Sequence, residues 1–148
     1  MNDRYLYRAK RKNWRELPKE MWWVEGYYAF IDNNHYIYTG NLCNGGLYVV
    51  AERLEIDIAT LCACTGLKDK NGKLIWENDI VHNGNYFVVK WNLSCARFDF
   101  ALNNSHNIPV GRWEPMIIDW KNSDFKEYRN NIDFEVIGNI FDNPELLE

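Results

Sequence analysis

The sequence lacks any apolar run as long as a membrane-spanning helix, which needs about 20 residues. Its first residues carry charges and are not followed by the apolar segment of a secretory signal. Lipidation motifs are also missing. We therefore expect a cytoplasmic protein without membrane contact, in which the four cysteines are reduced thiols.

Motifs that mark enzymes and cofactor sites are missing too. There is no glycine-rich phosphate loop and no Gly-x-Ser-x-Gly nucleophile motif, and the chain has only three histidines. The pair Cys62-x-Cys64 does not have the spacing of a structural zinc site. Acidic residues such as Asp69 and Asp79 stand beside turns, where turn chemistry alone accounts for them. These absences predict a protein that is not an enzyme and holds no cofactor or metal.

Aromatic residues are what the sequence has in excess. The 7 Trp, 9 Tyr and 7 Phe make up 16% of 148 residues, within a hydrophobic share of 47% and a charged share of 26%. This balance is typical of a globular protein. Aromatic and β-branched side chains recur in short runs that are separated by turn signals. The pattern predicts an antiparallel, mostly β protein.

Turn residues give the clearest local signals. Two Asn-Gly pairs, Asn71-Gly72 and Asn83-Gly84, each lie between apolar runs. Asn-Gly supplies the positive φ that a type I′ turn needs at both central residues, so each pair predicts a β-hairpin. A further turn is expected at Asp32-Asn33-Asn34, because Asp and Asn tolerate positive φ. Together these turns predict an antiparallel meander.

The segment around the first Asn-Gly pair resembles a known family. Residues 65–81 read Thr-Gly-Leu-Lys-Asp-Lys-Asn-Gly-Lys-Leu-Ile-Trp-Glu-Asn-Asp-Ile-Val, which resembles the signature segment of the YopX-like proteins of phages and prophages. Tyr7-Arg8-Ala9 is similar to that family's first strand, and residues 134–147 are similar to its closing strand and terminal helix. The resemblance implies an SH3-like barrel and a phage or prophage origin in a bacterium. It implies no biochemical activity.

We therefore predict two parts, either separate or joined in one compact unit. Residues 1–59 are expected to form an N-terminal β segment, packed on a YopX-like SH3-type barrel domain of residues 60–148 that ends in a short C-terminal helix. Within the signature segment, Asn78 stands where family members often have Gly, and Asn accepts the same left-handed backbone conformation. Asp79 is expected to accept backbone N–H bonds beside this turn. The residues expected in the core are Ile75, Ile80 and Val81.

Positive charge is concentrated at the start of the chain. Residues 1–20 hold 7 basic and 3 acidic side chains, whereas the remainder holds 10 and 18. Basic side chains can follow phosphates while aromatic rings stack on bases. A solvated basic strand face, with Tyr5 and Tyr7 buried beneath it, is the simpler interpretation. The candidate nucleic-acid contacts are Arg8, Lys10, Arg11 and Trp14.

Aromatic side chains also gather in the segment that follows. Trp22 and Trp23 are expected to face opposite sides of a strand, so that one of them lies in a second layer or against another chain. The candidate protein-interface residues are Trp22, Trp23, Tyr27 and Tyr28. The favoured function is a non-enzymatic phage or prophage accessory protein that contacts an unidentified host or phage protein, or further copies of itself in a homo-oligomer. A small-barrel nucleic-acid-binding protein that uses the basic N-terminal strand is the alternative.

Overall fold

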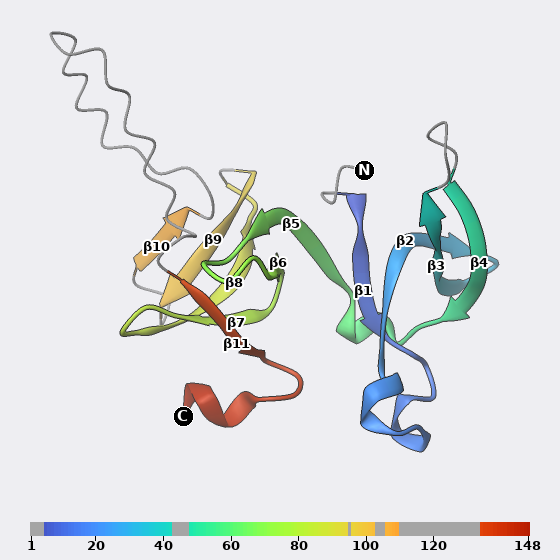
Figure 1. Cartoon of the computed structure of the whole chain (residues 1–148), viewed down its shortest axis with the longest axis horizontal. Helices are drawn as coiled ribbons and strands as arrows, with labels where there is room; N and C mark the ends of the chain where they lie inside the picture. Colours follow the sequence, from blue (N-terminus) through green and yellow to red (C-terminus); the bar gives the residue numbers. More distant parts are fainter. Residues whose placement is uncertain (1–4, 43–47, 95, 103–105, 110–133) are drawn as a thin grey trace, which may run out of the picture. The chain divides into compact units, whose positions relative to one another are not determined.

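The structure is a computed structural model that describes residues 5–42, 48–94, 96–102, 106–109 and 134–148. The chain divides into two compact units, residues 1–66 and residues 67–148, here called the N-terminal and C-terminal units. Nearly all regular structure in the described residues is antiparallel strand (Figure 1). The mostly β prediction is therefore confirmed.

The N-terminal unit contains the strands that come first in the chain. Their order in the sheet is β4-β3-β2-β1-β5, and β5 continues past Gly66 to pair with β6. Three short 3₁₀ helices stand between the strands. The bounds are β1 (Tyr7–Lys10), η2 (Trp14–Glu16), η3 (Lys19–Met21), β2 (Trp23–Ile31), β3 (Asn34–Leu42), β4 (Tyr48–Glu55), η4 (Ile58–Thr60), β5 (Cys62–Lys68) and β6 (Leu74–Trp76).

Alternation along β1 separates a core face from a second face. Tyr7 and Ala9 lie on the core side, in or against a buried cluster of Ala9, Val24, Ile37 and Ile56. After β4, Ile56 forms a single antiparallel bridge with Arg11. The end of β4 thus returns to β1, but no barrel is closed among the described strands.

The described strands of the C-terminal unit form an antiparallel meander. Its sheet has the order β10-β9-β8-β7-β11, in which β7, β8 and β9 each pair with the next strand along the chain and β11 pairs with β7. The described strands leave this sheet open, so they do not confirm the predicted SH3-like barrel. The predicted C-terminal helix is only a 3₁₀ turn, η6. The bounds are β7 (Asp79–His82), β8 (Tyr86–Asn92), β9 (Arg97–Leu102), β10 (His106–Pro109), β11 (Glu135–Asn139) and η6 (Pro144–Leu147).

Aromatic rings fill the core of the C-terminal unit. Phe134 stacks on Phe100, with ring centroids 4.1 Å apart, and meets Phe87 edge-on at 5.4 Å. The predicted core residues Ile75, Ile80 and Val81 are fully buried, which confirms that expectation. The buried cluster comprises Ile75, Val81, Phe87, Val89, Phe100, Phe134 and Val136.

The hairpins form where they were predicted, but their turn types differ from expectation. At Asn71-Gly72 and Asn83-Gly84 only the glycines have positive φ, so neither turn is type I′. His82 pairs with Tyr86, which leaves a three-residue loop in which one left-handed residue suffices. The two-residue turn with positive φ at both positions occurs instead at Asp32-Asn33, where φ is 50° and 62°.

Candidate functional site

The buried carboxylate of Asp69 joins the signature segment to the closing strand. Its Oδ1 accepts hydrogen bonds from the backbone N–H groups of Asn71, at 2.8 Å, and Lys73, at 2.9 Å. Its Oδ2 accepts one from the N–H of Val136 in β11, at 2.9 Å. A single side chain therefore fixes the hairpin turn and attaches it to a strand more than 60 residues away.

The next turn of the signature segment follows the sequence prediction. Asn78 has a φ of 68°. This is the left-handed conformation that was expected because YopX-like proteins often have Gly at this position. Asp79 is buried, and its Oδ2 accepts a hydrogen bond from the backbone N–H of Trp76 at 2.8 Å. In this position Asp79 has the structural role that the sequence predicted for it.

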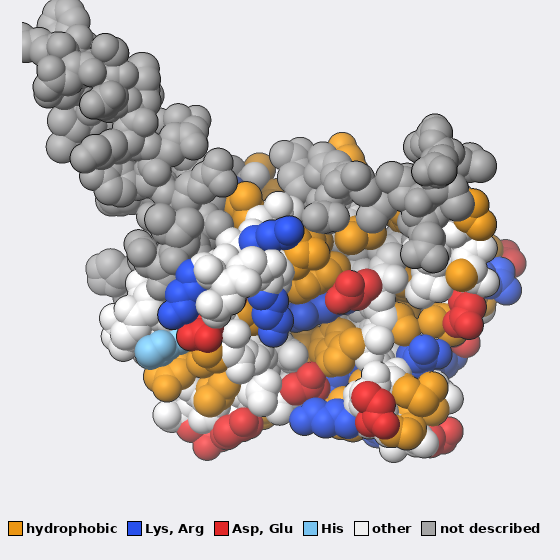
Figure 2. All heavy atoms as spheres, in the orientation of Figure 1, with side chains coloured by type: hydrophobic (Ala, Val, Ile, Leu, Met, Phe, Trp, Pro, Cys, Tyr) orange, Lys and Arg blue, Asp and Glu red, His pale blue; other side chains and the backbone are white. Residues whose placement is uncertain are grey.

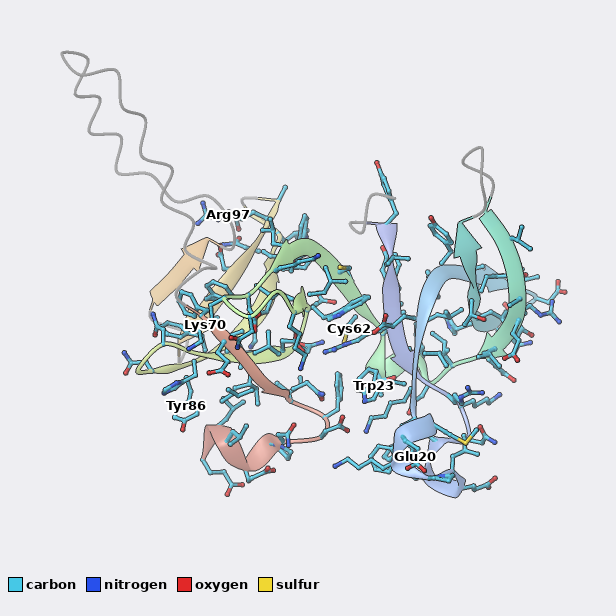
Figure 3. The ribbon with its side chains drawn as sticks, in the orientation of Figure 1. Glu20, Trp23, Cys62, Lys70, Tyr86 and Arg97 are labelled. Carbon is cyan, nitrogen blue, oxygen red and sulfur yellow. The ribbon has the colours of Figure 1, made fainter. Side chains whose placement is uncertain are left out.

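Lys10, one of the candidate nucleic-acid contacts, is only 1% exposed. Its ammonium nitrogen lies 4.0 Å from the ring centroid of Trp14, 4.3 Å from that of Trp22 and 5.5 Å from that of Trp23, which Figure 3 labels. We call this group the tryptophan cluster. A buried ammonium between indole rings does not reach a phosphate in solvent, so the structure corrects the proposed role of Lys10.

Trp14 is also engaged within the chain. The Arg15 guanidinium carbon lies 4.2 Å from its ring centroid, and the ring of Trp22 meets it edge-on at 4.8 Å. The indole N–H of Trp14 donates to Asp57 Oδ2 at 3.1 Å. Base stacking needs a free ring face, and these contacts occupy the ring of Trp14.

The two remaining basic candidates also make contacts inside the N-terminal unit. Arg11 donates from Nε to the carbonyl oxygen of Met21 at 2.9 Å. The Arg8 guanidinium carbon lies 4.9 Å from the ring centroid of Trp23. The four candidate nucleic-acid contacts therefore lie in one region, but their side chains contact other residues of the N-terminal unit, mainly those of the tryptophan cluster. Tyr5 is exposed and Tyr7 half-buried, so the buried pair expected under the basic face is not found.

The candidate interface residues do not form one surface patch. Both Trp22 and Trp23 approach the ammonium of Lys10, so the expectation that they face opposite sides is wrong. The reason is that β2 begins only at Trp23, whereas Trp22 ends the 3₁₀ turn η3. Tyr27 and Tyr28 do alternate along β2, and the hydroxyl of Tyr28 bonds His35 Nδ1 at 2.7 Å.

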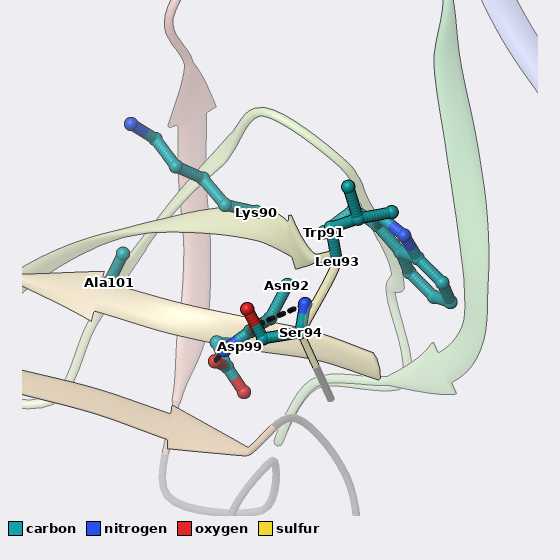
Figure 4. A pocket seen from close by; sticks show the side chains of 7 residues that line it. All are labelled: Lys90, Trp91, Asn92, Leu93, Ser94, Asp99 and Ala101. Atoms are coloured by element: carbon teal, nitrogen blue, oxygen red, sulfur yellow. Dashed lines mark hydrogen bonds between the residues drawn. The ribbon is translucent and has the colours of Figure 1, made fainter. Parts of the chain in front are cut away.

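A hollow of about 440 Å³ lies at the end of the β8–β9 hairpin (Figure 4). Leu93 is 85% exposed, the largest fraction among the large hydrophobic side chains that the structure describes, and Trp91 is 45% exposed. The ring of Trp91 rests edge-on against Phe98 at 4.9 Å, which holds it in place. The lining residues are Lys90, Trp91, Asn92, Leu93, Ser94, Asp99 and Ala101.

The carboxylate in the hollow is already paired. Asp99 is buried, and it accepts hydrogen bonds from Asn92 Nδ2 and from Arg97 Nε, both at 2.7 Å. Lys90 is exposed, and no described residue forms an ion pair with it. Figure 4 shows its side chain extending away from Asp99. The accessible charge of the hollow is therefore positive.

The hollow was not predicted from the sequence. The signal that could have found the site is Leu93, a large apolar residue between Asn92 and Ser94 in a short hairpin connection. A leucine in such a connection has no neighbouring apolar run to pack with.

Cys62 and Cys64 are buried free thiols, and Cys62 Sγ donates to the carbonyl oxygen of Thr60 at 3.2 Å. The described part of the chain contains no group of three His, Cys, Asp or Glu residues placed to hold a metal ion. Cys43 and Cys95 lie outside the described residues. No helix within the described ranges is long and apolar enough to cross a membrane.

A comparison with protein families finds a match over nearly the whole chain. The family model described as YopX protein matches residues 6–148. The chain belongs to the YopX family. The match includes the signature segment and both outlying segments that resembled YopX-like proteins, and it spans both compact units. No curated protein matches the chain.

Proposed function

We propose that this YopX-family chain is a non-enzymatic protein-interaction module, an accessory protein of a phage or prophage that acts in the cytoplasm of its host. Its partner binds at the hollow of the β8–β9 hairpin. The observation that carries the proposal is the exposure of two large apolar side chains, Leu93 and Trp91, at the end of the hairpin beside that hollow. The phage setting is supported by the resemblance of the signature segment, and an SH3-like closure of the C-terminal unit would suit such a module.

The physical argument concerns what these side chains gain when they are covered. Burying a leucine side chain is worth about 1.5–3 kcal/mol relative to leaving it in water. Tryptophan is among the residues that most often anchor protein interfaces. Trp91 is also fixed by its contact with Phe98, so binding costs it little side-chain entropy. Apolar anchors beside a hollow are suited to a protein partner.

The nucleic-acid alternative has less support in the described residues. Its candidate contacts Lys10 and Trp14 are engaged in the tryptophan cluster. On the face shown in Figure 2, acidic, basic and apolar side chains are interspersed, without a broad area of positive charge. An electrostatic binding surface for nucleic acid normally has such an area.

The test compares two leucines that are both exposed. Leu93→Ser removes the apolar anchor at the hollow, and Leu147→Ser, in η6, is the matched control because Leu147 is 43% exposed. A partner is captured with the unaltered chain, purified, and titrated against all three proteins. We expect Leu93→Ser to weaken direct binding at least about tenfold, as for an interface hot spot, and Leu147→Ser to leave it unchanged. Equal affinity of Leu93→Ser and the unaltered chain would overturn the proposal.

A further inference from the structure

We infer that Asn83, in the loop of the β7–β8 hairpin, is a site of spontaneous chemical modification. Its side-chain amide is converted to aspartate and isoaspartate, with water as the only co-reactant. Asn71, which is also followed by glycine, is protected from the same reaction by hydrogen bonds of the fold. The inference goes beyond the proposed function and does not depend on it.

The reaction needs an asparagine whose following backbone nitrogen is free to attack. That nitrogen forms a bond to Cγ of the side chain, the bond from Cγ to the amide nitrogen breaks, and ammonia leaves with the proton of the attacking N–H. Water then opens the resulting succinimide ring at one of its two carbonyl groups, which gives aspartate or isoaspartate. Glycine is the most permissive next residue, because it has no side chain beside the nitrogen and its backbone is the most flexible.

The two Asn-Gly pairs, Asn71-Gly72 and Asn83-Gly84, are similar in exposure and in local freedom. All four residues are exposed. Both glycines have positive φ, 79° for Gly72 and 107° for Gly84, and a Cβ atom added at either would meet nothing within 4 Å. Access of water and the space around the glycines therefore do not distinguish the two sites.

Hydrogen bonds do distinguish them. The N–H of Gly72, which would have to attack Asn71, donates to the carbonyl oxygen of Asp69 at 3.0 Å. The side-chain amide of Asn71 donates from Nδ2 to Glu135 Oε1 at 3.1 Å, which holds the leaving group. The backbone N–H groups of Asn71 and Lys73, on either side, donate to the Asp69 carboxylate. Attack at Asn71 therefore requires several bonds of the hairpin turn to open first.

The loop at Asn83 lacks these restraints. It consists of three residues, Asn83 to Asn85, between the paired residues His82 and Tyr86, the second of which Figure 3 labels. The N–H of Asn83 donates to the carbonyl oxygen of Asn85 at 3.2 Å. Neither the N–H of Gly84 nor the side-chain amide of Asn83 forms a hydrogen bond with any described residue. Both reacting groups are therefore free to approach each other.

The modification changes the hairpin in two ways. It replaces a neutral amide by a carboxylate, which makes the formal net charge of −4 one unit more negative. In isoaspartate the main chain also runs through the side chain, so the loop becomes longer by one methylene group. The change lies next to the ring pair of His82 and Tyr86, whose centroids are 4.8 Å apart. The product therefore has a negative charge beside an imidazole ring and a longer connection between β7 and β8.

The test compares the two asparagines within one sample of the full chain. The folded chain is incubated in mildly alkaline buffer, and a parallel sample is incubated in urea at a concentration that unfolds it. Aspartate and isoaspartate at Asn71 and Asn83 are then measured by peptide mapping with mass spectrometry. A third pair, Asn44-Gly45, lies outside the described residues, so its peptide is measured separately and does not enter the comparison.

In the folded chain, Asn83 should react at least about fivefold faster than Asn71, because opening one intramolecular hydrogen bond slows the attack by about that factor. In urea the two sites should react at similar rates, because only the local sequence then acts on them. The rate at Asn83 in the folded chain should also fall in mildly acidic buffer, in which the attacking nitrogen keeps its proton.

Circular dichroism before and after incubation checks that the folded sample stays folded. Equal rates at the two sites in the folded chain, or a faster reaction at Asn71, would overturn the inference. It would also be overturned if the folded chain gave no product at Asn83 over a time in which the unfolded sample reacts at both sites.

Discussion

Replacing Asp69 by alanine removes the acceptor of three backbone N–H groups at once. The N–H of Val136 belongs to a buried residue, so leaving it unpaired costs about 1–3 kcal/mol. Asn71 and Lys73 are exposed and their N–H groups can bind water, so each of those two bonds is worth about 0.5–1 kcal/mol net. We therefore expect Asp69→Ala to lower the free energy of unfolding by about 2–5 kcal/mol. This is a large share of the 5–15 kcal/mol typical of a domain.

Urea unfolding measures this loss, and amide hydrogen exchange at Val136 reports on the affected bond itself. Glu145→Ala, an exposed carboxylate in the same unit, is the matched control, with an expected change within about 0.5 kcal/mol. Asp69→Asn keeps one oxygen for Asn71 and Lys73 but turns an amide N–H₂ toward the N–H of Val136, so it should have an intermediate effect. If Asp69→Ala unfolds at the same urea concentration as Glu145→Ala, the structural role of Asp69 is refuted.

Three further predictions follow from single positions. Asn78→Val should lower the free energy of unfolding, measured in urea, by at least about 1–2 kcal/mol, because the φ of Asn78 is 68°. Asn78→Gly should unfold like the unaltered chain. Equal stability of the two variants would contradict the left-handed turn. Lys10→Ala should lower the free energy of unfolding by at least about 2 kcal/mol and change the near-ultraviolet circular dichroism of the tryptophans. An unchanged spectrum would argue against the tryptophan cluster. The hydrogen bond that Lys12 donates to Glu55 raises the pKa of Lys12 above its ordinary value of 10.5. Any stability from this exposed pair is present below pH 10.5 and lost as pH rises through the raised pKa. An NMR titration should show the pKa falling toward the ordinary value in Glu55→Gln, and no difference would refute the pairing.

Local patterns in the sequence predicted the strands and the places of the turns. Asp32-Asn33 and the two Asn-Gly pairs all lie in hairpins, because backbone freedom at these residues is a local property. The turn type was wrong at the Asn-Gly pairs because it depends on the loop length that the strand register imposes, which the residues of the turn alone do not contain. Closure of a barrel is likewise a property of the paired strands as a set.

The burial of Lys10 shows why the candidate site was harder to predict. Lys10 follows the core residue Ala9 in β1 and so starts out on the opposite face, where exposure was the natural expectation. The side chain is covered because the chain returns after Lys10 and brings Trp14 and Trp22 over its ammonium. Composition revealed the excess of aromatic residues, but only the fold shows that these rings meet a cation of the same chain.

The hollow depends on contacts that are equally invisible in the sequence. Trp91 alternates with Lys90 on β8 like a residue of an ordinary strand. Its partial exposure follows from its place at the end of the hairpin, beside the leucine that the connection leaves in solvent. The pairing of Asp99 with Arg97 and Asn92, which gives the site its positive character, requires the register of β8 against β9.

One NMR titration tests the central claim most directly, that partners bind at the hollow and not at the basic N-terminal residues. The indole N–H signals are followed in the full chain, with Trp91→Phe and Trp14→Phe used to assign the two that matter. The captured and purified partner and a single-stranded oligonucleotide are added in separate experiments. The account predicts that the partner shifts the Trp91 signal and leaves that of Trp14 in place, while the oligonucleotide shifts neither. A shift of Trp14 on addition of the oligonucleotide, with Trp91 unmoved by the partner, would contradict it.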